Sequence, residues 1–237
     1  MLSIIIPTLN EEDYIGRLLE LIRTQDFKDY EIIVADAGSK DKTLEIAKKY
    51  DCIIVLGGLP AKGRNNGAKI AKGSALLFMD ADIVLPPNFL KNTIKEFNKR
   101  KLGIASFRLS FYPKKIISYF LVDILYNRFI SLMENILPYA ATCIIIKKEL
   151  FDKIGGYDES IKLAEDYDLA RRATKYEKFG IIRSEQVLTS NRRFVKEGWL
   201  KMVAKLFLCE LHNLFIGPIR SDIFHYRFNH YKDQKIE

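Results

Sequence analysis

The fold class is decided by the stretch Ala75-Leu76-Leu77-Phe78-Met79-Asp80-Ala81-Asp82-Ile83-Val84. Five apolar residues lead into two carboxylates, with Gly73 before the run and two prolines, Pro86 and Pro87, after it. A short apolar run with such boundaries is typical of a buried strand in a parallel sheet. Open α/β sheets bind their ligands at the carboxyl ends of the strands, which is where this pattern places Asp80 and Asp82.

The two carboxylates of this stretch are candidates for a metal site. Residues two apart on an extended segment point the same way, so Asp80 and Asp82 can face one ligand. Converging carboxylates repel each other unless a cation lies near them, and oxygen ligands suit Mg²⁺ or Mn²⁺. The alternative is a solvated turn after a strand, and the Asp-x-Asp pattern alone leaves both interpretations open.

Strands and helices alternate through the part of the chain that precedes this stretch. We predict that the first strand ends at Ile6, and that Pro7 to Asn10 stop it and form the turn after it. Strand, helix and strand in repeated order predict a parallel sheet with right-handed crossovers, so the fold class is α/β. The expected strands cover residues 2–6, 31–34, 52–56 and 76–80, and the expected helices cover 11–24, 43–50 and 64–71.

The pattern is less regular after residue 86, and we predict no domain boundary in it. Residues 116–137 are amphipathic, with one polar stripe at spacings of three and four formed by Asp123, Asn127, Ser131 and Glu134. Residues 199–216 are apolar, with Lys201 and Lys205 on one side. The other expected elements are helices at 89–99, 148–154 and 166–173, and strands at 103–111 and 140–146.

Composition limits the classes of function. A chain of 237 residues that is 48% hydrophobic can build one large core. Its net charge of +8 favours anionic partners, namely a nucleotide diphosphate, a nucleic acid or an acidic membrane surface. The basic residues are scattered and form no recognition motif, so we do not expect nucleic-acid binding. No segment reaches the roughly 20 uninterrupted apolar residues of a spanning helix.

The cysteines and the start of the chain indicate a cytoplasmic location. Cys52, Cys143 and Cys209 are far apart in apolar runs, which predicts buried thiols in a reducing compartment. The chain enters a strand at once, without a basic leader, so we predict no secretory signal. The three histidines, His212, His225 and His230, lack metal-ligand spacing and are expected at the surface.

Two further positions are candidates for contacts with a nucleotide. Gly58 and Gly63 have the spacing of a P-loop, but Arg64 and Asn65 replace its Lys-Ser/Thr pair. The loop either places Arg64 at a helix start facing an anion, or leaves it as a solvated arginine. Asp36 ends a buried strand, where it can accept from a ribose hydroxyl or a base, or cap the next helix.

A cluster of acids is the candidate for a general base. Glu165, Asp166 and Asp168 open an expected helix, where acids are normal partners of the helix dipole. Three acids in four residues exceed what capping requires. An aspartate beside a metal–phosphate site can take a proton from a hydroxyl nucleophile.

Taken in order, these blocks resemble the inverting glycosyltransferases of family 2, which have the GT-A fold. The resemblance covers roughly residues 2–175, and more loosely a late basic segment. It implies a Rossmann-like nucleotide-binding half at 1–87, an acceptor half at 88–190, and a C-terminal helical and basic-aromatic segment at 191–237, all in one domain. The blocks are 4–12, 32–43, 64–73, 80–82, 155–172 and 192–199.

The resemblance also implies roles for single residues. Asp166 would be the catalytic base, Asp82 would ligate Mn²⁺ or Mg²⁺, and Glu165 and Trp199 would lie on the acceptor side. A departure from the family pattern is Ala37, where a second aspartate is common. The residues expected to contact the nucleotide-sugar are Pro7, Thr8, Asn10, Glu11, Asp36, Arg64, Asp80, Ala81, Asp82, Arg192 and Arg193.

The substrates stay open at this point. The donor would be UDP- or GDP-linked, and the acceptor a hydroxyl or phosphate of a glycan or of a polyprenyl-linked lipid. The apolar faces of 116–137 and 199–216 and the basic aromatic tail 224–228 would lie on the cytoplasmic face of a membrane, on a second copy in a homodimer, or against the core. Two rival functions are a haloacid-dehalogenase-like phosphotransferase with Asp80 as nucleophile, and a nucleotide-sugar-binding protein without catalysis.

Overall fold

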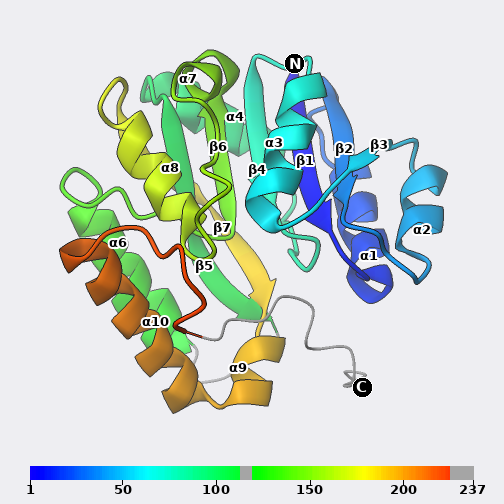
Figure 1. The fold of residues 1–237 in the computed structure, drawn as a ribbon. Helices are drawn as coiled ribbons and strands as arrows, with labels where there is room; N and C mark the ends of the chain where they lie inside the picture. Colours follow the sequence, from blue (N-terminus) through cyan, green and yellow to red (C-terminus); the bar gives the residue numbers. More distant parts are fainter. Residues whose placement is uncertain (113–118, 225–237) are drawn as a thin grey trace.

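The computed structural model describes residues 1–112 and 119–224 of the chain (Figure 1). One seven-stranded sheet with the strand order β3-β2-β1-β4-β6-β5-β7 runs through the molecule. Helices cover both faces of this sheet, which confirms the predicted α/β class (Figure 1).

The first half of the sheet is parallel, as the alternation of elements predicts. Its strands are β1 (Leu2–Thr8), β2 (Tyr30–Asp36), β3 (Ile53–Leu56) and β4 (Ala75–Met79). The connecting helices are α1 (Glu12–Arg23), α2 (Thr43–Lys49) and α3 (Pro60–Ile70). Because the strands run in one direction, Thr8, Asp36 and Asp80 lie at the same edge of the sheet, which we call the carboxyl edge.

The second half is mixed. The strand β6 (Cys143–Lys147) lies antiparallel between β4 and β5 (Ile104–Tyr112), while β7 (Phe179–Ser190) runs parallel to β5. The helices of this half are α4 (Phe89–Lys99), a π-helix η1 (Tyr119–Tyr126), α6 (Asn127–Met133), α7 (Lys148–Lys153), α8 (Glu165–Ala173), α9 (Arg192–Glu197) and α10 (Trp199–Phe215).

Two hydrophobic cores lie on the two faces of the sheet. On one face α1 and α4 bury residues such as Leu18 and Phe89 against Ile4 and Leu77. On the other face α3, α7 and α8 bury their apolar sides against alternate residues of the same strands, for example Phe78. Alternation along buried strands therefore supplies both layers, and the polar side chains are left for the strand ends.

Two predicted boundaries at the carboxyl edge are wrong. The first strand does not end before Pro7 but continues to Thr8, with Pro7 in register with Ala35 of β2. Pairing of β1 with β4 stops at Ile5, so Pro7 lies where the strand has lost one neighbour, and a proline is tolerated there. The helix predicted from Arg64 begins instead at Pro60, because proline is favoured in the first turn of a helix.

The predicted amphipathic helix at 116–137 is also corrected. Residues 113–118 lie outside the described part, and the rest forms η1 and then α6, which ends at Met133. Its polar stripe faces the protein: both amide atoms of Asn127 bond to the backbone of Leu109, and Glu134 pairs with Arg100 and Arg183. The apolar side of this segment is therefore exposed.

Two elements were not predicted at all. The strand β7 carries charged residues in its middle, and a bulge between Phe107 and Arg108 shifts its pairing, so it lacks a steady alternation. The short helix α9 buries none of its residues and has no apolar pattern. The strand expected at 140–146 begins only at Cys143.

The remaining expectations concern cysteines, histidines and membrane spans. Cys143 and Cys209 are buried and Cys52 is half-buried, and all three are free thiols. The half-buried His212 bonds through Nδ1 to the carbonyl of Gly217, whereas the other histidines and most of the basic aromatic tail lie outside the described residues. Within the described segments, no helix is both long and apolar enough to cross a membrane.

Two glycines give opposite predictions for stability. A Cβ at Gly57 would lie 2.6 Å from the carbonyl oxygen of Ala35, which is backbone of β2 and cannot move aside. A Cβ at Gly16, inside α1, would meet only Ile46 Cγ2 at 3.5 Å, an ordinary contact. We expect Gly57→Ala to destabilise the protein by about 1–3 kcal/mol and Gly16→Ala to stabilise it by up to about 1 kcal/mol. Urea unfolding measures both, and a stable Gly57→Ala protein would contradict the close approach of this loop to β2.

Candidate active site

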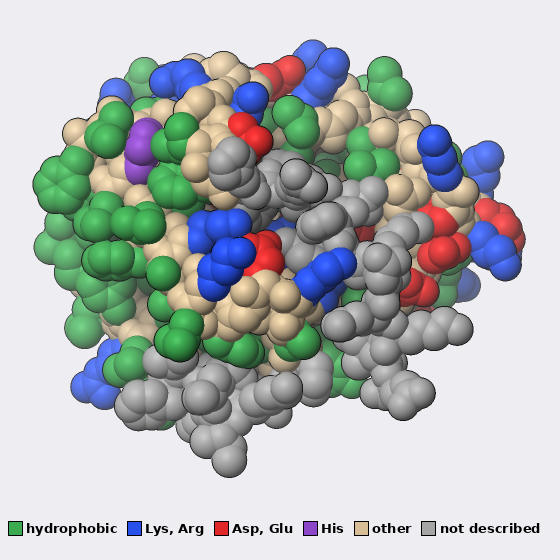
Figure 2. Space-filling view, turned by 60° about the horizontal axis from the view of Figure 1, so that its bottom comes forward, with side chains coloured by type: hydrophobic (Ala, Val, Ile, Leu, Met, Phe, Trp, Pro, Cys, Tyr) green, Lys and Arg blue, Asp and Glu red, His purple; other side chains and the backbone are tan. Residues whose placement is uncertain are grey.

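Two carboxylates follow β4 at the carboxyl edge, where Figure 2 shows acidic and basic side chains together near the centre of the face. The side chain of Asp82 is 11% exposed and that of Asp80 is 41% exposed. Burial raises the pKa of Asp82 to about 6, and the nearby carboxylates of Asp80 and Glu11 add to the rise while Arg192 and Arg193 oppose it. A site that disfavours the ionised form of a carboxylate in this way favours the binding of a cation beside it.

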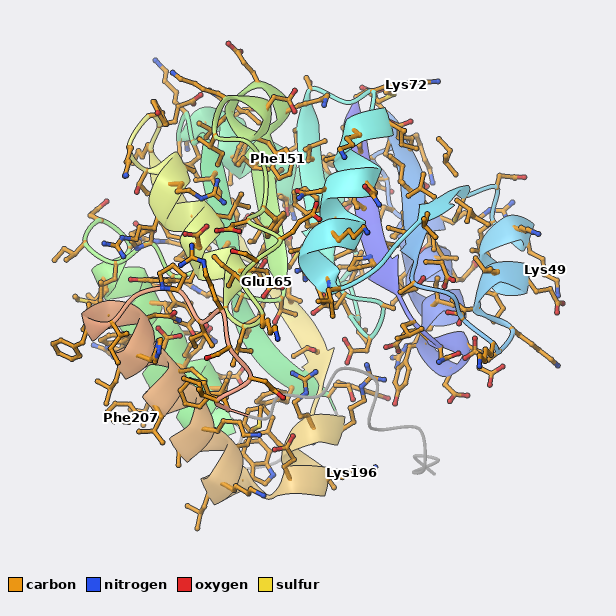
Figure 3. All side chains as sticks on the ribbon, in the orientation of Figure 1. Lys49, Lys72, Phe151, Glu165, Lys196 and Phe207 are labelled. Carbon is orange, nitrogen blue, oxygen red and sulfur yellow. The ribbon has the colours of Figure 1, made fainter. Side chains whose placement is uncertain are left out.

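The guanidinium of Arg64 joins three acids from different parts of the chain. Its Nη1 lies 2.6 Å from Glu165 Oε1 and 3.7 Å from Asp166 Oδ1, and its Nη2 lies 3.0 Å from Asp80 Oδ1. Arg64 is buried in the second turn of α3, whereas Glu165 and Asp166 open α8, with Glu165 between these two helices in Figure 3. Burial alone would lower the pKa of Arg64, but the carboxylates, Asp166 first, outweigh it and raise that pKa. The prediction of Arg64 at a helix start is wrong, because α3 begins four residues earlier, at Pro60. The alternative of a solvated arginine is also wrong, because Arg64 is only 4% exposed.

Asp166 has the environment of a proton acceptor. Burial raises its pKa to about 7, with Glu165 and Asp80 adding to the rise and Arg64 opposing it. Its Oδ1 accepts a hydrogen bond of 3.0 Å from the hydroxyl of Tyr157, which fixes its direction. A buried carboxyl group with a pKa near neutrality can exchange protons with a bound hydroxyl group.

A second arginine closes the other side of the site. Arg192, at the start of α9, donates two hydrogen bonds of 3.1 and 3.0 Å to the carboxylate of Glu11, and its Nε lies 3.3 Å from Asp82 Oδ2. Its guanidinium also lies over the ring of Tyr14, 4.6 Å from the centroid. Burial raises the pKa of Glu11 in spite of this pairing. Arg192 thus brings positive charge from the late segment to the first strand and to the Asp-x-Asp turn.

The loops after β1 and β2 are held together by Asp36. Its carboxylate accepts from the hydroxyls of Thr8 and Ser39, at 3.0 and 2.5 Å, and from the backbone N–H groups of Gly38 and Ser39. Asn10, in the left-handed region with φ of 55°, accepts from the N–H of Lys40. The alternative role, capping of the next helix, is wrong, because α2 begins only at Thr43 and the Asp36 carboxylate bonds to the turn before it. The contact of Asp36 with a ribose or base stays a prediction.

The other expected residues have different surroundings. Ala81 is buried in the turn between the two aspartates, and Pro7 lies beside Gly63 of α3. Arg193 acts on Asp82 through its charge. The ring of Trp199 meets that of Phe111 edge to face, with centroids 5.5 Å apart, and it is tilted against the ring of Phe194 at 4.8 Å. Its described contacts place it in this aromatic cluster and not with the carboxylates.

A cavity of about 230 Å³ opens beside Glu165. Its walls are the N-terminus of α3, the loop that leads into α8, and the segment 219–224 after α10. The N–H of Lys162 donates to the carbonyl of Ile219, and Arg220 pairs with Asp158, so the late segment is fastened to the loop before α8. The cavity offers room for a molecule next to the acids.

Sequence reasoning assigned no role to Tyr157 or Asn65. The side chain of Asn65 bonds to both the N–H and the carbonyl of Tyr157, and the tyrosine hydroxyl then reaches Asp166. The sequence signal was the glycine pair before Tyr157. The structure explains it: Gly156 has a φ of 68°, and a Cβ at this position would lie 2.7 Å from Asn65 Oδ1.

The two carboxylates of the Asp-x-Asp turn fit a metal ion that takes its remaining ligands from elsewhere. Among the residues that the structure describes, no group of three or more His, Cys, Asp or Glu side chains could hold a metal ion. The Asp-x-Asp turn supplies two carboxylates. Mg²⁺ is usually bound by one or two carboxylates together with substrate phosphates, so this set fits such an ion in the presence of a phosphorylated ligand.

Comparisons with known proteins agree on one family. Residues 3–155 match the family described as glycosyl transferase family 2. An uncharacterized glycosyltransferase of Rickettsia prowazekii is 34% identical over 181 residues, which are 71% of this chain and 57% of that protein. The chain thus spans little more than half the length of this curated relative.

Two solved structures share the fold. Residues 1–349 of Staphylococcus aureus TarS superpose with a TM-score of 0.65 and 23% identity, covering 90% of this chain and 65% of that one. A mannosyltransferase of Pyrobaculum calidifontis superposes with a TM-score of 0.70 and 20% identity, covering 94% and 68%. At these identities the two structures support the GT-A fold and nothing finer.

Proposed function

The chain belongs to glycosyl transferase family 2, and on this premise we propose that it transfers a sugar from a nucleotide-sugar to an acceptor hydroxyl or phosphate, with inversion at the anomeric carbon. The observation that carries the proposal is the meeting of Asp80, Glu165 and Asp166 around the buried Arg64. Asp82, two residues after Asp80, lies beside Arg192. Acids for a leaving diphosphate and an acid for the nucleophile then lie at one edge of the sheet.

The donor would lie across residues 1–87, at the carboxyl edge. The TarS structure has been solved with UDP and with UDP-GlcNAc, and the mannosyltransferase with GDP-Man and Mn²⁺. A nucleotide-sugar donor is thus supported, and these two neighbours bind different bases. Thr8, Asn10 and Asp36 form the loops that would meet the base and ribose, and Arg192 and Arg193 the charge that would meet the diphosphate.

Asp82, with Asp80 beside it, would hold Mn²⁺ or Mg²⁺. Such a cation would neutralise the charge that develops on the departing nucleoside diphosphate. Arg192 would add fixed positive charge at the same place, and it would have to exchange Asp82 for the phosphate oxygens when the donor binds.

Asp166 would act as the base in a single displacement. The acceptor O–H gives its proton to the Asp166 carboxylate, the acceptor oxygen bonds to the anomeric carbon, and the bond from that carbon to the diphosphate breaks. Tyr157 orients Oδ1 of Asp166 through its hydrogen bond. Arg64 bonds to both Asp80 and Glu165, and so it would keep the metal-binding turn and the start of α8 at a fixed distance.

The acceptor would enter through the cavity beside Glu165. This cavity is formed by parts of 88–190 and 191–224, the segments expected to serve the acceptor, together with the start of α3. The ring contacts of Trp199 are with Phe111 and Phe194, so a role for it toward the acceptor would be exerted through this aromatic cluster. The rival in which Asp80 is a phosphotransferase nucleophile is disfavoured by the match of residues 3–155 to glycosyl transferase family 2.

The first test is nucleotide binding with and without Mn²⁺. We expect a Mn²⁺-dependent rise in Tm for UDP, GDP or one of their sugar conjugates, and its loss in Asp82→Asn. A ligand at a hundred times its Kd stabilises by about 2.7 kcal/mol, and each kcal/mol raises Tm by about 2–4 °C in a chain of this size.

The matched control for this test is Asp13→Asn, an exposed acid on α1. It should keep the full nucleotide-dependent shift. A wild-type protein that shows no shift with any of these nucleotides, with or without Mn²⁺, would refute the donor site.

A further inference from the structure

The outer sides of η1, α6 and α10 together form an exposed apolar surface, which we call the apolar face. Hydrophobic side chains gather on the left of Figure 2, the side on which Figure 1 places α6 and α10. Leu200 is 89% exposed, and Phe215 and Ile216 are each 78% exposed. Other members are Leu132, Ile136 and Phe207. Contiguous apolar patches of this kind are uncommon on monomers and mark interaction surfaces.

The orientation of α6 is fixed by hydrogen bonds to Asn127 and to Glu134, the residue that follows the helix. Asn127 completes the backbone bonding of Leu109, and Glu134 accepts from Arg100, Arg183 and the N–H of Ile181. Turning α6 to bury its apolar side would leave these polar groups unpaired, at a cost comparable to that of a lost buried hydrogen bond for each. The apolar side of α6 is therefore exposed because its polar side is bonded to the interior of the protein.

The charges on the apolar face have one sign. Among the described residues of 122–137 and 199–216, the exposed charged side chains are Arg128 and Lys201. The acids of the same segments have partners in the protein: Asp123 accepts from Ser110 and Gln186, Glu134 is buried, and Glu210 bonds to Tyr139. A second copy would present the same two cations and no exposed acid, whereas an anionic lipid surface presents the complementary charge.

We propose that the apolar face docks on the surface of an anionic bilayer, with Arg128 and Lys201 among the lipid headgroups and the apolar side chains in the boundary between headgroups and acyl chains. Helices with one apolar side and cations beside it lie in this plane of a membrane. The segment 217–224, which runs from the end of α10, forms one wall of the cavity beside Glu165. If the proposed function holds, a lipid-linked acceptor would therefore reach the base from the bilayer on which the protein rests.

The test is co-sedimentation with vesicles of phosphatidylcholine alone and of an equal mixture of phosphatidylcholine and phosphatidylglycerol. We expect wild-type protein to bind the mixed vesicles, and to bind less as salt is raised. Arg128→Gln with Lys201→Gln should weaken this binding about 25-fold, at about fivefold for each cation. Leu132→Gln with Phe207→Gln should weaken it more than about tenfold, because both side chains leave the lipid boundary.

Matched controls lie in the last turn of α3 and just after it, at the far end of the molecule. Lys72 and Phe207 are labelled at opposite ends of Figure 3. Lys69→Gln with Lys72→Gln removes the same charge, and Ile70→Gln removes an apolar side chain that is 41% exposed. Both controls should bind the mixed vesicles as wild type does.

Three results would overturn the proposal. The first is that wild-type protein does not bind the mixed vesicles, and the second is that the control variants lose vesicle binding as much as the test variants do. The third is a wild-type dimer in light scattering that the Leu132→Gln/Phe207→Gln protein does not form, while neither protein binds vesicles. The last result would assign the face to a second copy. The nucleotide-dependent Tm shift, measured on the same samples, reports on the proposed function separately, so either idea can fail alone.

Discussion

Asp166→Asn is expected to lower kcat by about 10²–10⁴-fold while leaving metal-dependent nucleotide binding intact. The substitution keeps the shape of the side chain but removes the group that takes the acceptor proton. Asp82 and Arg192, which would serve the diphosphate, remain as they are. Turnover is measured as release of nucleoside diphosphate from the donor identified by the Tm screen, and binding by the Tm shift.

Asp168→Asn is the control on the same helix. Asp168 accepts a hydrogen bond of 2.7 Å from Arg172 Nε and belongs to the outer acids of the first turn. Its substitution should leave kcat close to that of wild type. Equal losses in the two variants would assign the effect to the helix terminus and refute Asp166 as the base.

The same assignment fixes the direction of the pH profile. A base must be deprotonated, and the pKa of Asp166 is raised to about 7, so kcat/KM should rise with pH up to about that value and then level off. The residual activity of Asp166→Asn should lack this rise. A wild-type rate that falls between pH 5 and about 7 would contradict the role.

Arg64→Gln is expected to lower the free energy of unfolding by about 3–5 kcal/mol. The guanidinium is buried at 4% exposure and bonds to Glu165 and Asp80, so its removal leaves acids packed together without a counter-charge. Asp166, the third acid beside Arg64, has a pKa raised to about 7, so it carries its negative charge at pH 8 and not at pH 5, and the loss should be larger at pH 8. Urea unfolding at the two pH values measures it.

A double variant separates charge from packing. If the loss comes from unpaired acid, Glu165→Gln combined with Arg64→Gln should cost less than the sum of the single losses. Arg23→Gln, which removes an exposed arginine from α1, should change stability by less than about 0.5 kcal/mol. Additive losses at residues 64 and 165 would show that the ion pair contributes nothing to the fold.

The sequence predicts the parallel half of the fold well because its evidence is local. Each strand there is a short apolar run followed by a polar turn, so Asp36, Asp80 and Asp82 could be placed at the carboxyl edge from spacing alone. The strand β7 carries no such pattern, because its middle residues face solvent and α4 and its pairing is interrupted by a bulge. Its position follows from the tertiary pairing with β5.

The candidate site divides in the same way. The identities of the acids could be predicted, but their common partner could not, since Arg64 and Glu165 are 101 residues apart in the chain. The pairing of Arg192 with Glu11 spans 181 residues and depends on α9, which has no sequence signal. In 116–137 the periodicity was visible, but which side faces the interior depends on Leu109 and Arg100, partners that only the fold provides.

The antiparallel insertion of β6 beside β4 has a consequence for protein engineering. Because β4 bonds to β1 on one side and to β6 on the other, a fragment that ends near residue 87 would carry an open, apolar sheet edge. Such an edge recruits other chains, so the fragment should aggregate instead of folding as an independent module. Hybrids between family members are therefore better joined at the loops of the carboxyl edge, where the candidate site can be exchanged without cutting the sheet.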